Sequence, residues 1–434
     1  MASSNAIKLD MYAPFVAELM ELAGSEEQDG DAAIAAVLNG DAYAALRELV
    51  PLESRRAFGI FFTSPEYARS LLELLDSNKN PKYKVLDPAC GAGDLLLAYA
   101  NHLPLSSTLE KTLAAWGEVL YGIDISEELV STTKLRIALL AKQRGNFSGP
   151  IQESTYSFPH IRCANALQTK KALSEVDLIL LNPPYQGTKT PNSCSWASGK
   201  VSAAAIFVEH IVRHMGPDTR LYAILPEVLR CGSRYQKFRE AIGKYVDSPK
   251  VLSLGTFDQW TDIDVFVCEL RPRENALDNL SPPIFEFPDT QSSLVGDRFN
   301  VHVGPVVAYR SPKTGVLRPY LEARDASPWS EAHVCKKTRA FSGSVFDPPF
   351  VVIRRTSRPG DTHRAVGTII KGTGPVAIEN HLIVAIPKKQ TVKECNALLR
   401  VLRNSETNAF LDAAMRCRHL TVQSVKDIPW SENE

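Results

Sequence analysis

The chain has 434 residues, of which 44% are hydrophobic and 23% charged, a composition typical of a globular protein with two or three cores. The sequence has no run of 18 apolar residues, and its first ten residues, MASSNAIKLD, have no apolar signal core, so we expect neither a membrane span nor secretion. The eight cysteines are dispersed without a CxxC pair, which favours reduced, mostly buried thiols in a cytosolic protein over a disulfide framework or a metal site.

The formal net charge is zero, but the charge is unevenly distributed. Residues 301–434 contain 20 Lys and Arg against 12 Asp and Glu, a net charge of +8, so the preceding residues carry −8. A basic C-terminal third indicates a polyanionic partner for that third. A chance distribution of surface charge is the alternative.

In chain order, residues 1–55 are rich in alanine and acidic side chains and are predicted to be helical. From about residue 84, apolar runs alternate with amphipathic stretches. The predicted strands are KVLDP, VLYGIDIS, HIRCANAL, VDLILL and RLYAILP, followed by a closing pair, KVLSLGTF and DVFVCEL. This alternation predicts an α/β fold with a doubly wound, largely parallel sheet.

After Leu270 the polar, proline-containing stretch RPRENALDNLSPP predicts a domain boundary. Short strands are predicted beyond it at VVAYR, FVVIRR, VGTII and HLIVAIP, followed by the helical stretch KECNALLRVLRNSETNAFLDAAM. The sequence therefore predicts a helical segment over 1–55, a catalytic domain over 56–272 and a basic α+β domain over 273–434.

Ligands of doubly wound sheets bind at the carboxyl ends of the strands. The first predicted strand ends in DPACGAGD, where Gly91 and Gly93 would let a ligand approach the backbone. Asp94 at the helix start would repel a pyrophosphate and suits a ligand with an ammonium group. Asp124, at the end of the second strand, is placed to accept hydrogen bonds from ribose hydroxyls. The pattern predicts a nucleoside ligand; a glycine turn that merely packs a helix on the sheet is the alternative.

The fourth strand, VDLILL, runs into Asn182-Pro183-Pro184-Tyr185. Proline has a fixed φ and no N–H, so the corner cannot continue a strand ladder and presents its amide and aromatic ring rigidly. A stiffened buried turn without a functional role is the alternative interpretation.

These stretches together resemble a known family. DPACGAGDLL, GIDIS, CANAL and NPPY resemble the successive motifs of S-adenosylmethionine-dependent amino-methyltransferases. FGIFFTSPEYARSLLELL is similar to the extra cofactor motif that precedes the glycine turn in one branch. The motif order resembles the gamma-type DNA adenine-N6 methyltransferases of restriction–modification systems, over residues 55–270 and more loosely to the end.

The resemblance implies a Rossmann-like seven-stranded methyltransferase sheet with a C-terminal α+β target-recognition domain. It also implies S-adenosyl-L-methionine as cofactor and double-stranded DNA as partner, without a metal or a membrane. One departure is Asn165, which stands where the family usually has Asp to pair with the cofactor's adenine amine; the Asn oxygen can still accept. The residues implied to bind the cofactor are Thr63, Asp87, Ala89, Gly91, Asp94, Asp124, Asn165, Asn182 and Phe207.

The chemistry of adenine gives the proline corner a role. Its exocyclic amine is a poor nucleophile that needs fixed hydrogen-bond acceptors, which the Asn182 oxygen and the Pro183 carbonyl can supply beside Pro184. Tyr185 then offers a ring face to a base extruded from the duplex. By resemblance, Phe257 lies on the far side of that base, with Trp260 as a rival. For phosphate contacts the basic domain offers Arg354, Arg355, Arg358 and Arg364, although a solvated basic strand face is the alternative.

Three functions stay open from the sequence. The first is site-specific methylation of adenine N6 in DNA, with a cognate restriction endonuclease or other defence partner acting separately, because a leader of some 55 residues is too short for a nuclease domain. The second is methylation of RNA or of a protein glutamine amide. The third is a non-catalytic DNA-binding subunit, against which the intact NPPY argues.

Overall fold

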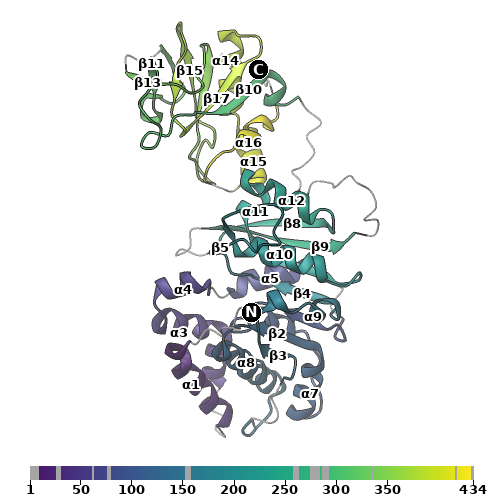
Figure 1. The fold of residues 1–434 in the computed structure, drawn as a ribbon. Helices are drawn as coiled ribbons and strands as arrows, with labels where there is room; N and C mark the ends of the chain where they lie inside the picture. The colour runs from purple at the N-terminus through teal and green to yellow at the C-terminus, as the bar shows by residue number, and fades with distance from the viewer. Residues whose placement is uncertain are drawn as a thin grey trace. The chain divides into compact units, whose positions relative to one another are not determined.

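The structure is a computed structural model that describes residues 9–25, 31–60, 63–75, 80–151, 158–257, 263–273, 284–285, 293–333, 337–415 and 418–431. The chain forms two compact units (Figure 1). The first comprises Met1–Arg230 and Lys237–Phe285, and the second comprises Cys231–Gln236 and Glu286–Glu434. The boundary near residue 285 lies beyond the position predicted from the sequence, 272.

The first unit is built on a seven-stranded sheet with the order β3-β2-β1-β4-β7-β9-β8. The strands β1, β2, β3, β4 and β7 are parallel, while β9 is antiparallel to both β7 and β8. The predicted largely parallel sheet with a closing pair is therefore confirmed. The strands are β1 (Val85–Asp87), β2 (Leu120–Asp124), β3 (Ile161–Cys163), β4 (Leu178–Leu181), β7 (Arg220–Pro226), β8 (Val246–Thr256) and β9 (Asp264–Pro272).

Every residue of β4 is buried, as expected for a strand that carries helices on both faces of its sheet. A short antiparallel hairpin, β5 and β6, follows the proline corner. The elements between and around the strands are α5 (Pro65–Glu73), α6 (Asp94–Ala100), α7 (Leu109–Val119), α8 (Glu127–Gly145), η5 (Ala166–Gln168), α9 (Lys171–Ser174), β5 (Gly187–Lys189), β6 (Lys200–Ser202), α10 (Ala203–His214), α11 (Glu227–Cys231), η6 (Ser233–Tyr235) and α12 (Gln236–Ile242).

The N-terminal helices belong to the first unit and not to a segment of their own, which differs from the predicted division at residue 55. Helix α1 packs against α8 (Figure 1), and the backbone N–H of Ile151 donates to the Ala23 carbonyl at 2.8 Å. This contact explains why α8 lacks a continuous solvent face, since 12 of its residues are buried. The N-terminal elements are η1 (Asp10–Tyr12), α1 (Ala13–Gly24), α2 (Asp31–Ala36), η3 (Val37–Asp41), α3 (Ala42–Leu49) and α4 (Leu52–Phe58).

The second unit contains a five-stranded sheet, β10-β17-β14-β15-β12, and a three-stranded sheet, β13-β11-β16. Its strands are β10 (Phe299–Val303), β11 (Val316–Leu321), β12 (Glu331–His333), β13 (Thr338–Phe341), β14 (Phe350–Arg354), β15 (Gly367–Lys371), β16 (Ala377–Ile378) and β17 (Leu382–Pro387). Its helices are α13 (Val295–Arg298), η7 (Ala323–Asp325), α14 (Val392–Arg403), α15 (Ser405–Ala414) and α16 (Val422–Lys426).

The prediction of a strand at VVAYR is wrong. Of its residues only Val306 forms an isolated β-bridge, to Glu379, and the chain then turns. The predicted long C-terminal helix is two helices, because Asn404 leaves the helical conformation and caps α15 by accepting from the Glu406 N–H at 3.0 Å. Strands β14, β15 and β17 lie where the sequence predicted them. Across the described ranges, no helix is long and apolar enough to cross a membrane.

Candidate functional site

The glycine turn follows β1 directly and is held by its own polar groups. The Asp87 carboxylate accepts from the Ala89 N–H at 3.0 Å, and the Thr133 hydroxyl of α8 donates to the Gly91 carbonyl at 2.8 Å. Gly93 has φ = 89°, and a Cβ there would lie 2.8 Å from the Thr133 methyl group. Only glycine fits this position without a shift of α8, so the turn lies close against the helix.

Asp124 joins the ends of β1 and β2. One carboxylate oxygen accepts from the Gly91 N–H and the other from the Ser126 N–H, each at 3.0 Å. Burial raises the pKa of Asp124, and these backbone donors act in the opposite direction. Each oxygen keeps a lone pair, so the carboxylate is a fixed acceptor pair that suits the hydroxyls of a ribose.

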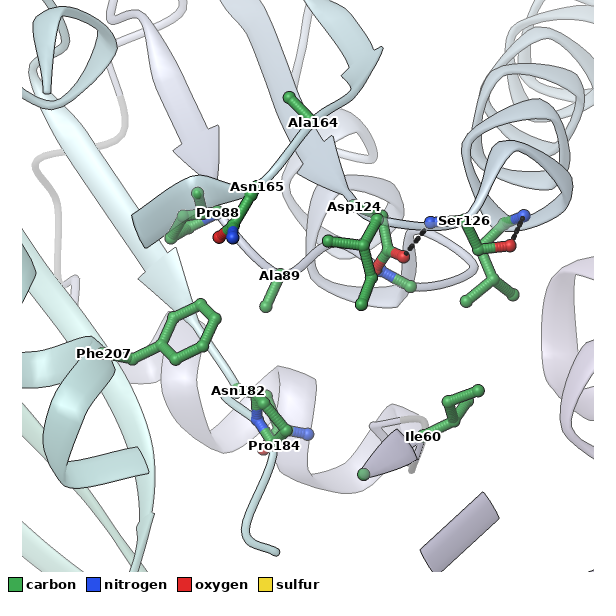
Figure 2. A pocket seen from close by; sticks show the side chains of 15 residues that line it. Ile60, Pro88, Ala89, Asp124, Ser126, Ala164, Asn165, Asn182, Pro184 and Phe207 are labelled. Atoms are coloured by element: carbon green, nitrogen blue, oxygen red, sulfur yellow. Dashed lines mark hydrogen bonds between the residues drawn. The ribbon is translucent and has the colours of Figure 1, made fainter. Parts of the chain in front are cut away.

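These groups lie at a cavity of about 100 Å³ that is partly open to solvent. Figure 2 shows Phe207 and Asn182 facing the strand ends that carry Ala89, Asp124 and Asn165. The cavity is lined by Gly59, Ile60, Pro88, Ala89, Gly91, Asp124, Ile125, Ser126, Leu129, Ala164, Asn165, Ala166, Asn182, Pro184 and Phe207.

The residues fit a nucleoside-bearing cofactor such as S-adenosylmethionine. Asp124 supplies the acceptor pair, and Phe207 on α10 supplies a ring that a purine can pack against. Asn165, on the loop after β3, uses its side-chain oxygen to accept from the Leu167 N–H at 3.0 Å. One lone pair of that oxygen and the amide NH₂ group stay available to the edge of a base.

Six of the nine residues predicted to bind the cofactor line this cavity: Ala89, Gly91, Asp124, Asn165, Asn182 and Phe207. The other three do not. Asp87 is buried behind the turn, where burial first, and then the neighbouring Asp124 and Asp94 carboxylates, raise its pKa to about 8. Its contact in the structure is to the turn backbone.

Thr63 and Asp94 line a neighbouring cavity together with Leu38 and Arg136. Asp94 forms an ion pair with the buried Arg136 at 2.8 Å and accepts from the Thr63 N–H at 3.1 Å. Because the Asp94 charge is already balanced, the expectation that it faces an ammonium group gains no support from the structure.

Several lining residues were not predicted from the sequence. Ile125, Ser126 and Leu129 follow Asp124 in the β2–α8 connection, so a ligand held by Asp124 would also touch them. Gly59 and Ile60 come from the stretch upstream of α5. The glycine of FGIFF could have indicated these two residues, because a glycine often marks a helix end. Gly59 indeed ends α4 with φ = 70°.

The Asn-Pro-Pro-Tyr corner follows β4 and reaches the same cavity through Asn182 and Pro184. The Asn182 NH₂ group donates to the Thr63 hydroxyl at 2.9 Å, and the Tyr185 hydroxyl donates to the Asn182 oxygen at 2.8 Å. Burial raises the pKa of Tyr185, so this hydroxyl stays protonated and can donate. The corner is thus closed by side-chain hydrogen bonds in addition to the two prolines.

Aromatic rings gather beside the corner. Phe257 stacks on Tyr67 at 5.5 Å between ring centroids and meets the edge of Tyr185 at 5.6 Å. Phe257 is only 6% exposed. Tyr67, on α5, was missed by the sequence reasoning, although it lies in the upstream motif FFTSPEY. Trp260, the predicted rival of Phe257, lies outside the described residues.

The predicted DNA-contacting arginines do not form one group. The prediction is wrong for Arg364, whose side chain is fully buried and donates to the Asp412 carboxylate, the Ser357 hydroxyl and the Met415 carbonyl. Arg354 and Arg355 are half-buried and donate to backbone carbonyls. Arg358 is exposed. A guanidinium group whose partners all lie inside the protein cannot reach a phosphate. Successive side chains of β14 also point to opposite faces of its sheet, so neighbouring residues there do not form one basic surface.

Within the described ranges, no three or more His, Cys, Asp or Glu side chains form a group that could hold a metal ion. The six cysteines of these ranges form no disulfide bonds with one another.

A doubly wound sheet whose glycine turn, second-strand Asp and NPPY corner share one cavity defines the methyltransferase class of α/β proteins. The model of the N-6 DNA methylase family matches residues 36–251 of the chain.

Two further proteins are similar to the chain. A curated relative, the methylase subunit of the type I restriction enzyme MpnII of Mycoplasma pneumoniae, is 23% identical over 292 residues, which are 61% of this chain and 49% of the relative. The chain thus spans about half the length of that relative. The solved structure of the type IIL restriction–modification enzyme MmeI in complex with DNA matches 89% of this chain and 70% of that chain, with a TM-score of 0.53 and 13% identity. The second similarity supports the fold.

Proposed function

We propose that the chain is a site-specific DNA methyltransferase that acts on adenine N6 as the modification component of a restriction–modification system. The observation that carries the proposal is the shared cavity: Asn182 and Pro184 of the NPPY corner line the same space as Gly91, Asp124 and Phe207. A nucleoside cofactor held by the strand ends would therefore lie in contact with the corner. The match of residues 36–251 to the family model supports the choice of DNA.

The bound cofactor supplies the methyl group. The residues of the chain position the two reactants. Asp124 would hold the ribose hydroxyls through its two oriented oxygens, and Phe207 would pack on the purine. Asn182 has a second lone pair on its side-chain oxygen, and the Pro183 carbonyl lies next to it in the chain. Both oxygens accept from the target amine and so orient the nitrogen lone pair for attack.

The half-buried ring of Tyr185 supports a target base that leaves its duplex, because unpaired bases stack on aromatic side chains. Phe257 contacts this ring and is itself covered by Tyr67. The net charge of +8 on residues 301–434 supports a DNA-binding role for the second unit. S-adenosylmethionine and duplex DNA are the ligands to supply.

The test uses tritiated S-adenosylmethionine and unmethylated genomic DNA, followed by nuclease digestion and mass spectrometry of the nucleosides. We expect N6-methyladenine with the wild-type protein. Asn182→Ala should lower transfer by about 10²- to 10³-fold, as removal of a preorganised catalytic hydrogen-bonding group does, while the affinities for cofactor and DNA should fall far less than the rate.

The matched control is Asn192→Ala, the same substitution at an exposed turn ten residues along the chain, which should leave transfer unchanged. Label that appears in RNA or in a protein glutamine in place of DNA would contradict the proposal. Equal activity of wild type and Asn182→Ala would remove the corner from the mechanism.

A further inference from the structure

A continuous series of hydrogen bonds runs from the N-terminal helices to Asn182. We infer that Thr63 is a positioning residue that fixes the rotation of the Asn182 carboxamide and thereby presents its oxygen to the target amine. This inference rests on the proposed function, and it assigns Thr63 a role different from the cofactor contact implied by the family resemblance.

The need for such a residue follows from the chemistry of asparagine. Rotation about the last side-chain bond of Asn is soft and roughly two-fold, so a carboxamide exchanges its oxygen and its NH₂ group unless hydrogen bonds select one orientation. An NH₂ group turned toward the target amine would repel it, because both are donors. The backbone prolines of the corner fix where the side chain begins but not how its end is rotated.

Asn182 is held at both ends of the amide. Its NH₂ group donates to the Thr63 hydroxyl at 2.9 Å, while its oxygen accepts from the Tyr185 hydroxyl at 2.8 Å. The Tyr185 hydroxyl also lies 3.3 Å from the Ile224 carbonyl, so the Asn182 oxygen is its nearer acceptor. With these two partners, the oxygen keeps one lone pair for the target.

Thr63 can serve as a fixed reference point. It is 8% exposed, and its backbone N–H donates to Asp94 at 3.1 Å. It does not line the cavity that Asp124 and Phe207 form. Its hydroxyl therefore meets the corner and not the ribose or purine region of the cofactor site.

Asp94 is in turn fixed by Arg136 of α8. The guanidinium group lies 2.8 Å from the Asp94 carboxylate, and it also donates to the Ala92 carbonyl at 2.6 Å and the Val37 carbonyl at 2.9 Å. Val37 belongs to η3, so the N-terminal helices supply one of the acceptors that hold this arginine. The arginine is 2% exposed, which shields the ion pair from solvent.

The test compares Thr63→Val, which is nearly isosteric but lacks the acceptor, with Thr63→Ser, which keeps it. We expect kcat for DNA methylation to fall about tenfold in Thr63→Val, the effect of one hydrogen bond, and to stay within about threefold of wild type in Thr63→Ser. The affinity for S-adenosylhomocysteine, measured by calorimetry, should be unchanged in both. In the Asn182→Ala background, Thr63→Val should have no further effect.

Two outcomes would overturn the inference. If Thr63→Val weakens S-adenosylhomocysteine binding by the same factor as it lowers kcat, Thr63 contacts the cofactor. If Thr63→Val and Thr63→Ser have equal kcat, the hydroxyl does not position Asn182.

A spectroscopic measurement separates this inference from the proposed function. In protein labelled with ¹⁵N-asparagine, the side-chain NH₂ resonance of Asn182 is assigned by its loss in Asn182→Asp. That resonance should shift and exchange faster with solvent in Thr63→Val but not in Thr63→Ser. If wild-type protein methylates no DNA, the proposed function fails, while this comparison still decides whether Thr63 holds the amide; an unchanged resonance in Thr63→Val would show that it does not.

Discussion

At the scale of single residues, the carboxyl group of Asp87 behaves differently from an ordinary surface acid. It is 2% exposed, and burial raises its pKa from 3.8 to about 8. The Ala89 N–H, which it accepts at 3.0 Å, only partly offsets the cost of an unsolvated charge. Between these pH values the folded protein binds more protons at this site than the unfolded chain does.

This difference in bound protons predicts a pH dependence of stability. Because the pKa of Asp87 is higher in the folded state, its contribution to stability is present below pH 3.8 and is lost as the pH rises through about 8. Asp87→Asn keeps an acceptor for the Ala89 N–H but cannot ionise. Urea unfolding at pH 5 and pH 8 should therefore show a smaller loss of stability with pH in the variant.

Asp124 has a pKa raised in the same direction, so part of the pH dependence is common to both proteins. The difference between wild type and Asp87→Asn isolates Asp87. Identical pH dependence of the two would show that Asp87 is ionised as readily in the folded state as in the unfolded chain.

At the scale of elements, helix α4 ends against the proline corner. Gly59 closes the helix with φ = 70°, and a Cβ at this position would lie 2.6 Å from the Pro184 Cβ. The end of α4 and the proline corner can therefore pack this closely only because Gly59 has no side chain. This contact ties the stretch upstream of α5 to the NPPY corner.

Gly59→Ala should consequently displace the corner. We expect methyl transfer to DNA to fall by about tenfold or more, since small misplacements of positioning groups are costly to rate. The matched control is Gly149→Ala, because Gly149 has φ = 85° and a Cβ added there would meet no atom within 4 Å. It shares the backbone strain of a positive φ without the clash. Thermal unfolding midpoints of the two variants should be similar. Equal rates of transfer in both would contradict a specific contact with Pro184.

At the scale of the whole molecule, the arginines of the basic second unit are of two kinds: some are buried and bind other parts of the protein, and others are exposed to solvent. Arg364 lies in the connection between β14 and β15 and joins it to α15 and its C-cap through Asp412 and Met415, while it also donates to Ser357 of the same connection. Arg358 of that connection is exposed. If the second unit binds DNA, Arg358 is the one of the four predicted arginines whose exposed side chain is available to a phosphate.

Arg358→Ala should therefore weaken DNA binding and reduce the magnitude of the slope of log K against log salt by about 1, the contribution of one phosphate contact. Arg364→Ala should lower the unfolding midpoint, because the Asp412 carboxylate loses its buried partner. Fluorescence anisotropy with labelled duplex DNA at several salt concentrations measures the first effect, and thermal unfolding measures the second. An unchanged slope in Arg358→Ala would exclude this arginine from the DNA contact.

The sequence alone determined those features that depend on local patterns. Alternating strand and helix periods predicted the parallel sheet, because a buried strand must be apolar on both faces and a crossover helix on one. The residues at strand ends predicted the cavity, since the carboxyl ends of neighbouring parallel strands necessarily meet at one edge; Gly91, Asp124, Asn165 and Asn182 therefore lie together.

The tertiary structure decided which polar groups face each other across long separations in the chain. Thr63 and Asn182 are 119 residues apart, and Arg136 meets Val37 over 99 residues. Arg364 has the same side chain as the exposed Arg358, yet it is buried because Asp412 of a distant helix meets it. The sequence shows which charged side chains the protein has. Whether each one is paired inside the protein or available to a ligand depends on the partner that folding brings within hydrogen-bond distance.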